Sequence, residues 1–382
     1  MIIGIVKEII EGENRVAITP DVAAKLIKKG FSVMIEEDAG LNSGFENEKY
    51  IAAGVRLVPD PIELYKESEI VLKVGRPIIH PNYGKSELEL MKPGTILISF
   101  VYSLHYPEIA KKAAECKINL IAMDAIPRTT IAQRMDALSS QANLAGYKSV
   151  ILAANYLKKI FPLMMTASGT ISPAKIVIMG AGVAGLSALG TAKRLGAVVE
   201  VSDIRPSAKE EVQSLGGKFI EVPVDENMQD EKGYAKEASE EFLKKQKDLI
   251  FKHITEADIV ITTALVPGRK SPLLVTEEMV KNMKQGSVVL DMAVEFGGNC
   301  EISEAGKIIS KFGKTIIGEG NLPSLVPYHA SEMYSKNLQN LLEYVSKDGI
   351  FNFNMEDEII SQAAIVKDGV IVHEKTKSIL TK

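Results

Sequence analysis

The chain has 382 residues, of which 46% are hydrophobic and 25% are charged, a composition typical of a folded globular protein. This length predicts two domains, and a net charge of −4 excludes an electrostatic nucleic-acid binder. Its two cysteines, Cys116 and Cys300, offer neither a disulfide framework nor a metal-ligand spacing, so we expect a reducing cytoplasm and no metal.

No targeting or membrane-spanning segment is expected. The first 15 residues reach acidic side chains before an apolar core develops. The most apolar stretch, residues 149–171, carries two lysines and a proline, so direct membrane insertion is not predicted.

The first third of the chain alternates short apolar runs with amphipathic segments, which predicts a mostly parallel sheet covered by helices on both faces. The expected strands are residues 2–8, 32–37, 69–75, 95–100 and 118–124. The segments 20–30 and 107–117 read as helices, each with a proline in its opening turn.

A long helix is expected over 136–160, followed by a Gly/Ser/Pro joint at 169–174. The alternation then restarts, with a helix at 331–346 that packs back on the first domain and a tail whose Lys-Asp-Gly turn joins two short strands. The expected strands of the second domain are 175–179, 198–203, 217–222, 258–264, 287–293 and 314–319.

These elements predict an α/β protein with two doubly wound, Rossmann-like parallel-sheet domains separated by a cleft. The first comprises residues 1–136 and 330–382, and the second, a dinucleotide-binding domain, comprises residues 137–329.

A glycine loop opens the second domain. Gly180, Gly182 and Gly185 have the G-x-G-x-x-G spacing, directly after an apolar strand and at the start of a helix. Gly180 permits a tight turn, Gly182 lets the backbone approach a pyrophosphate, and Gly185 allows close helix–strand packing. A tight βα turn without a ligand is the alternative interpretation.

Asp203 ends the next strand, 18 residues past Gly185. Its carboxylate can accept hydrogen bonds from an adenosine ribose and would repel a 2′-phosphate, which favours NAD over NADP. Arg205 complicates this preference, since a guanidinium there could tolerate that phosphate.

A second polar group gathers at the start of the long helix, where Arg128, Gln133, Asp136 and Ser139 offer donors and acceptors that could orient a nicotinamide. Hydride transfer between two nicotinamides needs such orienting hydrogen bonds and no proton acceptor. The alternative interpretation is an ordinary first helical turn, with Asp136 complementing the helix dipole.

Five stretches carry a family resemblance that extends over nearly the whole chain. They are "PRTTIAQRMDALSSQANLAGYKSV", "GAGVAGLSALGTAKRLGAVVEVSDIRP", "GYAKEASEEFLKKQ", "ITTALVPGRKSPLLVTEEMV" and "VLDMAVEFGGNCE". Together they resemble the NAD(H)-binding component, domain I, of proton-translocating NAD(P)⁺ transhydrogenase, in the form where it is a separate soluble alpha subunit.

The resemblance implies a homodimer that binds NAD(H) and exchanges hydride with NADP(H) on a second component. A membrane-spanning component would couple this exchange to proton translocation. The chain would then be cytoplasmic and peripherally associated with the inner membrane through these partners.

Carried over by motif, the resemblance assigns further residues to the cofactor. Arg128, Gln133, Asp136 and Ser139 would lie on the nicotinamide side, and Tyr234 would be a lid over the reacting rings. Arg134 departs from the motif, which has a small residue there. The remaining cofactor-binding residues implied are Val183, Asp203, Ile204, Arg205, Gly233, Gln246 and Leu265.

Two alternatives stay open. NAD-dependent alanine dehydrogenase is a relative, and Arg15, Lys73 and His105 resemble its substrate-carboxylate and acid/base positions. Structural ion pairs explain Arg15 and Lys73 equally well, and a lone histidine such as His105 is more often a packed or capping residue than a catalyst. A non-catalytic NAD-binding regulator is the third hypothesis, and it gives no reason for the polar group at 128–139.

Overall fold

The computed structural model describes residues 1–221 and 240–381, without the side chains of 240–246. The chain forms two compact units, and the boundary between residues 142 and 143 falls inside one helix, α6 (Ala137–Tyr156). Unit 1 comprises residues 1–142, 267–269 and 323–382, and unit 2 comprises residues 143–266 and 270–322.

Within the described residues, unit 1 is built on an eight-stranded sheet in the order β19-β18-β6-β5-β4-β1-β2-β3. The six strands from β6 to β3 are parallel, whereas β18 and β19 are antiparallel. The strands are β1 (Ile2–Ile5), β2 (Ser32–Glu36), β3 (Arg56–Val58), β4 (Ile70–Leu72), β5 (Ile96–Ser99), β6 (Asn119–Ala122), β18 (Ala364–Lys367) and β19 (Val370–Ile371).

Burial explains why the central strands of unit 1 are continuous apolar runs. Every residue of β4, β5 and β6 is buried, because parallel strands covered on both faces have no polar side. All five strands predicted in this region are present, although β1 ends at Ile5. The three-residue strand β3, at the edge of the sheet, was not predicted.

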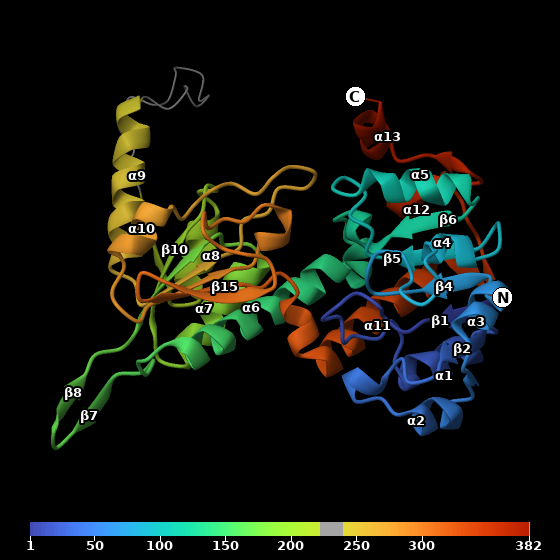
Figure 1. Ribbon diagram of the computed structural model, residues 1–382, viewed down its shortest axis with the longest axis horizontal. Helices are drawn as coiled ribbons and strands as arrows, with labels where there is room; N and C mark the ends of the chain where they lie inside the picture. Colours follow the sequence, from blue (N-terminus) through green and yellow to red (C-terminus); the bar gives the residue numbers. More distant parts are fainter. Residues whose placement is uncertain (222–239, 382) are drawn as a thin grey trace. The chain divides into compact units, whose positions relative to one another are not determined.

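Helices cover both faces of the unit 1 sheet (Figure 1). The predicted helix near the C-terminus is confirmed as α11, which contributes the buried side chains of Tyr334, Leu338 and Leu341 to the core shared with β1 and α1. The helices are α1 (Pro20–Lys28), α2 (Asn47–Ala52), α3 (Pro61–Glu67), α4 (Glu87–Leu90), α5 (Pro107–Glu115), α11 (Pro327–Val345), α12 (Glu358–Ala363) and α13 (Glu374–Leu380).

Unit 2 contains, in its described residues, a seven-stranded sheet in the order β11-β10-β9-β12-β13-β15-β14. All of its strands are parallel except β14, which pairs antiparallel with β15. The strands are β9 (Lys175–Met179), β10 (Val198–Ser202), β11 (Lys218–Phe219), β12 (Ile259–Thr262), β13 (Val288–Asp291), β14 (Lys307–Lys311) and β15 (Lys314–Gly318).

The chain order of unit 2 reverses between β9 and β12, which is the doubly wound arrangement predicted from the sequence. Ligands of such sheets bind beyond the carboxyl ends of the strands at this reversal. The remaining helices of unit 2 are α7 (Val183–Arg194), α8 (Ala208–Ser214), α9 (Glu240–Thr255) and α10 (Glu277–Asn282).

A small hairpin, β7 (Met164–Thr166) and β8 (Gly169–Ile171), extends from the body of unit 2 (Figure 1). The sequence predicted a loop over 169–174, and this is wrong at its start because 169–171 pairs with the strand before it. Every residue of both strands is exposed. No helix of the described chain is both long and apolar enough to span a bilayer.

Candidate functional site

The glycine loop lies at the carboxyl end of β9, where the chain order of the unit 2 sheet reverses. Gly180 has a φ of +113°, and a Cβ there would lie 2.5 Å from Thr263 Oγ1. A Cβ on Gly185 would lie 1.9 Å from the Gly180 carbonyl oxygen. Both positions therefore require glycine, one for the turn and the other for the contact between α7 and the loop.

Gly182 differs, because its φ is −75° and a Cβ there would meet no described atom within 4 Å. It is the N-cap of α7 and supplies no side chain, so no side-chain acceptor caps the first turn of this 12-residue helix. The space over Gly182 therefore faces backbone N–H groups at the positive end of a helix dipole, a geometry that suits a phosphate group.

Asp203 follows β10, next to the glycine loop. Its Oδ2 accepts a hydrogen bond from the Ala181 backbone N–H at 2.7 Å, and its Oδ1 accepts from the Arg205 N–H at 2.8 Å. The Arg205 guanidinium donates to Asp203 Oδ1 through Nε at 3.1 Å and to the Ala181 carbonyl at 3.1 Å. Burial alone would raise the pKa of Asp203, but these hydrogen bonds outweigh it and lower the pKa.

Three apolar side chains that the family resemblance assigned to the cofactor are exposed at this edge of the sheet. Val183 begins α7, Ile204 follows β10 with 93% of its surface exposed, and Leu265 lies three residues after β12. These exposed apolar side chains are free to pack against the planar rings of a ligand. Gly233 and Tyr234 lie outside the described residues, and so does the side chain of Gln246.

Sequence reasoning missed the side chains that hold the loop after β12. Asn299 accepts from the Ala264 N–H at 3.0 Å and donates to the carbonyls of Ala264 and Pro272. Buried Asp291 accepts from the backbone N–H groups of Asn299 and Cys300. The acidic residue that ends the apolar run "VVLD" could have indicated that Asp291 holds a loop at the end of its strand.

The second predicted group lies in unit 1, where η3 (Ala132–Met135) meets α6. Asp136 Oδ1 accepts from the Ser139 backbone N–H at 2.9 Å, and its Oδ2 accepts from Ser139 Oγ at 2.6 Å. This is the contact of an N-capping carboxylate, so the structure brings these two residues together at the start of the helix.

Arg128 and Gln133 are exposed and make no side-chain hydrogen bond with any described residue. Helix α11 holds the backbone beside them, because Asn337 Nδ2 donates to the Arg134 carbonyl at 2.9 Å. The Arg134 side chain is itself exposed, so it adds a cation to this surface.

Residues 4–145 match the family described as alanine dehydrogenase/PNT, N-terminal domain, and residues 149–374 match its C-terminal domain. A Rickettsia prowazekii protein, named as the first part of NAD(P) transhydrogenase subunit alpha, is 46% identical over 377 residues, which cover 98% of this chain and 97% of that protein. The chain belongs to the NAD(P) transhydrogenase alpha-subunit branch of this family. The membership predicted from the sequence is thereby confirmed.

Solved structures agree with this membership. The transhydrogenase structure from Sinorhizobium meliloti superposes with a TM-score of 0.86 at 43% identity, covering 97% of this chain and all of that one. An L-alanine dehydrogenase structure superposes with a TM-score of 0.80 at 25% identity, covering 100% of this chain and 99% of that one. This α/β fold is therefore shared with a transhydrogenase and with an L-alanine dehydrogenase.

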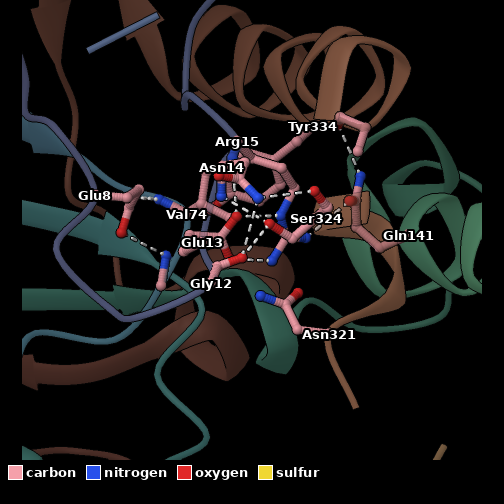
Figure 2. Close-up of polar contacts among 12 residues, drawn as sticks. Glu8, Gly12, Glu13, Asn14, Arg15, Val74, Gln141, Asn321, Ser324 and Tyr334 are labelled. Atoms are coloured by element: carbon pink, nitrogen blue, oxygen red, sulfur yellow. Dashed lines mark hydrogen bonds and ion pairs between the residues drawn. The ribbon is translucent and has the colours of Figure 1, made fainter. Parts of the chain in front are cut away.

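Arg15, Lys73 and His105 resemble functional positions of alanine dehydrogenase. In this chain each of them has a partner within unit 1. Arg15 forms a two-pronged ion pair with Glu13, Nη2 to Oε2 at 2.6 Å and Nε to Oε1 at 2.8 Å. Its Nη1 donates to Gln141 Oε1 at 2.9 Å, as Figure 2 shows.

Lys73 is fully buried at the end of β4, between two carboxylates. Its Nζ lies 2.6 Å from Glu87 Oε1 and 3.4 Å from Glu8 Oε2. Burial would lower the pKa of Lys73, but the two carboxylates raise it well above its usual value. Burial raises the pKa of Glu8 to about 7, and Lys73 only partly opposes this.

His105 lies in a turn after β5, and its imidazole forms a hydrogen bond with a backbone N–H group. Its Nε2 accepts a hydrogen bond from the Gly268 N–H at 3.0 Å, and burial lowers the pKa of its imidazole. The imidazole thus favours its neutral form, which can accept this hydrogen bond.

Proposed function

We propose that this chain is the NAD(H)-binding component of a proton-translocating transhydrogenase. NADH bound here would pass its hydride to NADP⁺ on a partner component, giving NAD⁺ and NADPH, or the reverse. The glycine loop carries this proposal, because the open space at Gly182 faces the uncapped first turn of α7.

In this proposal the pyrophosphate lies at the N-terminus of α7, over Gly182 and beside Val183. The adenosine ribose hydroxyls would bond to Asp203, with Ile204 against the adenine side. The Asp203–Arg205 ion pair favours NAD over NADP, since Arg205 already donates to Asp203 and to a backbone carbonyl.

The nicotinamide would be oriented by Arg128, Gln133, Asp136 and Ser139, with Leu265 packing on its ring. The exposed donors of Arg128 and Gln133 are available to a ligand, and the Asp136–Ser139 pair gives a fixed acceptor. Tyr234, Gly233 and Gln246 would complete the cofactor site, with Tyr234 as the side chain that excludes water.

Hydride exchange between two nicotinamides requires neither a proton acceptor nor a cation for a substrate carboxylate. The ion pairs of Arg15 and Lys73 in unit 1 agree with such a reaction. A dehydrogenase of amino acids needs a free cation for the substrate carboxylate and a base for its proton. Arg15 and Lys73 are instead neutralised by carboxylates of this chain. This pairing favours the transhydrogenase role over alanine dehydrogenase.

A homodimer is included in the proposal, and the β7–β8 hairpin supports it. An isolated two-stranded hairpin is marginally stable in water. Here it exposes Leu163, Met164, Met165 and Ile171, and Met165 has 76% of its surface exposed. A second copy of the chain would cover these side chains. The dimer would attach to the cytoplasmic membrane through the NADP(H)-binding and membrane-spanning components.

An NADH-oxidation assay under two conditions tests the proposal. One mixture contains pyruvate and ammonium, and the other contains the NADP(H)-binding component and NADP⁺ without a keto acid. We expect turnover only in the second mixture. Turnover in the first mixture would instead show that the chain is an alanine dehydrogenase. NADH binding without turnover in either mixture would favour a non-catalytic NAD-binding regulator.

A further inference from the structure

Asn337 is a buried amide on the apolar face of α11. The other side chains of this face, Ala330, Tyr334, Leu338 and Leu341, follow the spacing of one side of a helix. Asn337 lies among them with 7% of its surface exposed. A buried amide costs free energy unless its donor and its acceptor are both bonded, so an amide in this core calls for an explanation.

Both polar atoms of Asn337 bond to the segment where η3 meets α6. Its Nδ2 donates to the Arg134 carbonyl at 2.9 Å, and its Oδ1 accepts from Ser140 Oγ at 2.7 Å. A carbonyl can only accept, so this contact fixes which end of the amide faces Arg134. One side chain of α11 therefore connects two residues that lie on either side of Asp136 and Ser139 in the sequence.

The backbone between these two contacts departs from the helical path. Asp136 has a φ of −69° and a ψ of +85°, which separates η3 from α6. The Asp136 N–H reaches the Gln133 carbonyl only at 3.4 Å. Helix ends leave backbone groups without helical partners, so contacts from another element fix the direction of η3 relative to the start of α6.

Apolar packing holds the same segment to the core and leaves its polar side chains outside. Ala132, Met135 and Ala137 are buried in the core to which α11 contributes. Gln133 is exposed, and Asp136 is partly exposed. Apolar packing is non-directional, whereas a hydrogen bond depends on its angle, so the contacts of Asn337 restrain rotations of the segment that packing alone would allow.

Helix α11 also holds the α6 side of this break through a second amide. Buried Gln141 donates through Nε2 to the Ala330 carbonyl at 3.0 Å, and its Oε1 accepts from Arg15 Nη1 at 2.9 Å (Figure 2). On the η3 side, the Arg134 carbonyl accepts from Asn337 and, at 3.3 Å, from Asn340 Nδ2. Asn337 is the residue that bonds to both sides.

We propose that Asn337 is a positioning residue for hydride exchange. It would act through Asp136, by keeping the Asp136–Ser139 pair at the angle that orients the nicotinamide. Hydride transfer requires two carbons in register, and a displacement of about 1 Å can lower the rate on the order of 100-fold. This inference rests on the proposed function, because it concerns the same nicotinamide site.

A double-mutant cycle tests whether Asn337 acts through Asp136, with NADH on the full chain and NADP⁺ on the partner component. We expect Asn337→Ala to slow single-turnover hydride transfer by about tenfold and to change the NADH dissociation constant by less than about twofold. In an Asp136→Asn background, the same substitution should slow transfer by less than about twofold, because the group that Asn337 positions is already lost. Gln339→Ala is the matched control, since this amide of α11 donates to Glu343 on the same helix at 2.9 Å.

The Tm of each variant is measured as well, because the substitution removes a buried amide. If Asn337→Ala is unfolded at the assay temperature, Ser140→Ala takes its place in the cycle. It removes the bond to Oδ1 and leaves the bond from Nδ2 to Arg134 intact. We expect Ser140→Ala to slow transfer by about threefold, with the same loss of effect in the Asp136→Asn background.

Equal slowing in both backgrounds, or a fall in NADH affinity that matches the fall in rate, would overturn the positioning role of Asn337. A parent rate in the Asn337 or Ser140 variant, when Asp136→Asn is slow, would overturn it too and leave the proposed function standing. If Asp136→Asn transfers hydride at the parent rate, or the parent chain transfers none, the proposed function fails and the positioning role fails with it.

Discussion

Glu8 is the residue whose ionisation most clearly limits the stability of unit 1. In the ion pairs described for unit 1, three buried carboxylates, Glu8, Glu13 and Glu87, share two buried cations, Arg15 and Lys73, one acidic group more than basic groups. An uncompensated charge in the interior costs free energy, so the cluster favours binding one proton. The pKa of about 7 at Glu8 follows from this burial.

Replacing Glu8 by Gln should change how stability depends on pH. The raised pKa means that the folded chain binds the proton more tightly than the unfolded chain, so this stabilisation is complete below pH 4.5 and is lost as the pH rises through 7. The loss amounts to about 3 kcal/mol. We expect the Tm of the parent to fall relative to Glu8→Gln over this range. Exposed Glu11→Gln is the control, and parallel curves for parent and Glu8→Gln would refute the assignment.

Asp136 has a different role, because it fixes Ser139 at the start of α6. We expect Asp136→Asn to slow hydride transfer by on the order of 100-fold, since small misplacements of reacting groups have large effects on rate. NADH affinity should change little, because in the proposed site the glycine loop would hold most of the dinucleotide. Stopped-flow transfer and NADH titration separate the two effects, with exposed Asp21→Asn as control. An equal fall in both would contradict an orienting role.

The glycine loop shows how one element combines folding and binding constraints. Gly185→Ala would place a methyl group 1.9 Å from the Gly180 carbonyl, so we expect a large loss of Tm. Gly182→Ala meets nothing within 4 Å and has an ordinary φ, so the fold should persist. Its methyl group would instead occupy the proposed pyrophosphate position. We therefore expect Gly182→Ala to have a normal Tm and an NADH affinity reduced by about tenfold. An unchanged NADH affinity would show that the pyrophosphate does not lie over Gly182.

Elements with strong local signals were predictable from the sequence. Buried parallel strands such as β9 and β12 appear as uninterrupted apolar runs, and the glycine spacing marks the turn between β9 and α7. The β7–β8 hairpin was missed because strands of three residues are too short to show a periodic pattern, even within an apolar stretch. The edge strand β14 was missed because its sequence, KIISK, is mostly exposed and begins and ends with lysine. The pairing of Arg15 with Glu13 and of Lys73 with Glu87 depends on tertiary contacts that no local pattern encodes.

At the scale of the whole molecule, the exposed hairpin predicts the oligomeric state. Met165→Glu introduces a charge into an apolar surface that a second copy would bury, so we expect it to convert a dimer to a monomer. Sedimentation equilibrium measures this directly. Ile350→Glu, which changes an apolar residue with 66% exposure in unit 1, should leave the dimer intact. A parent chain that sediments as a monomer would exclude the homodimer.

The sheet of unit 1 joins both ends of the chain, since β18 pairs with β6 and the N-terminal ammonium of Met1 donates to the Gly349 carbonyl. Synthesis on the ribosome proceeds from the N-terminus, so β6 leaves the exit tunnel long before the strand that covers its edge. All of unit 2 emerges in between. The second unit can therefore fold first, while the first holds an apolar sheet whose unpaired edge is prone to aggregation until β18 has been made.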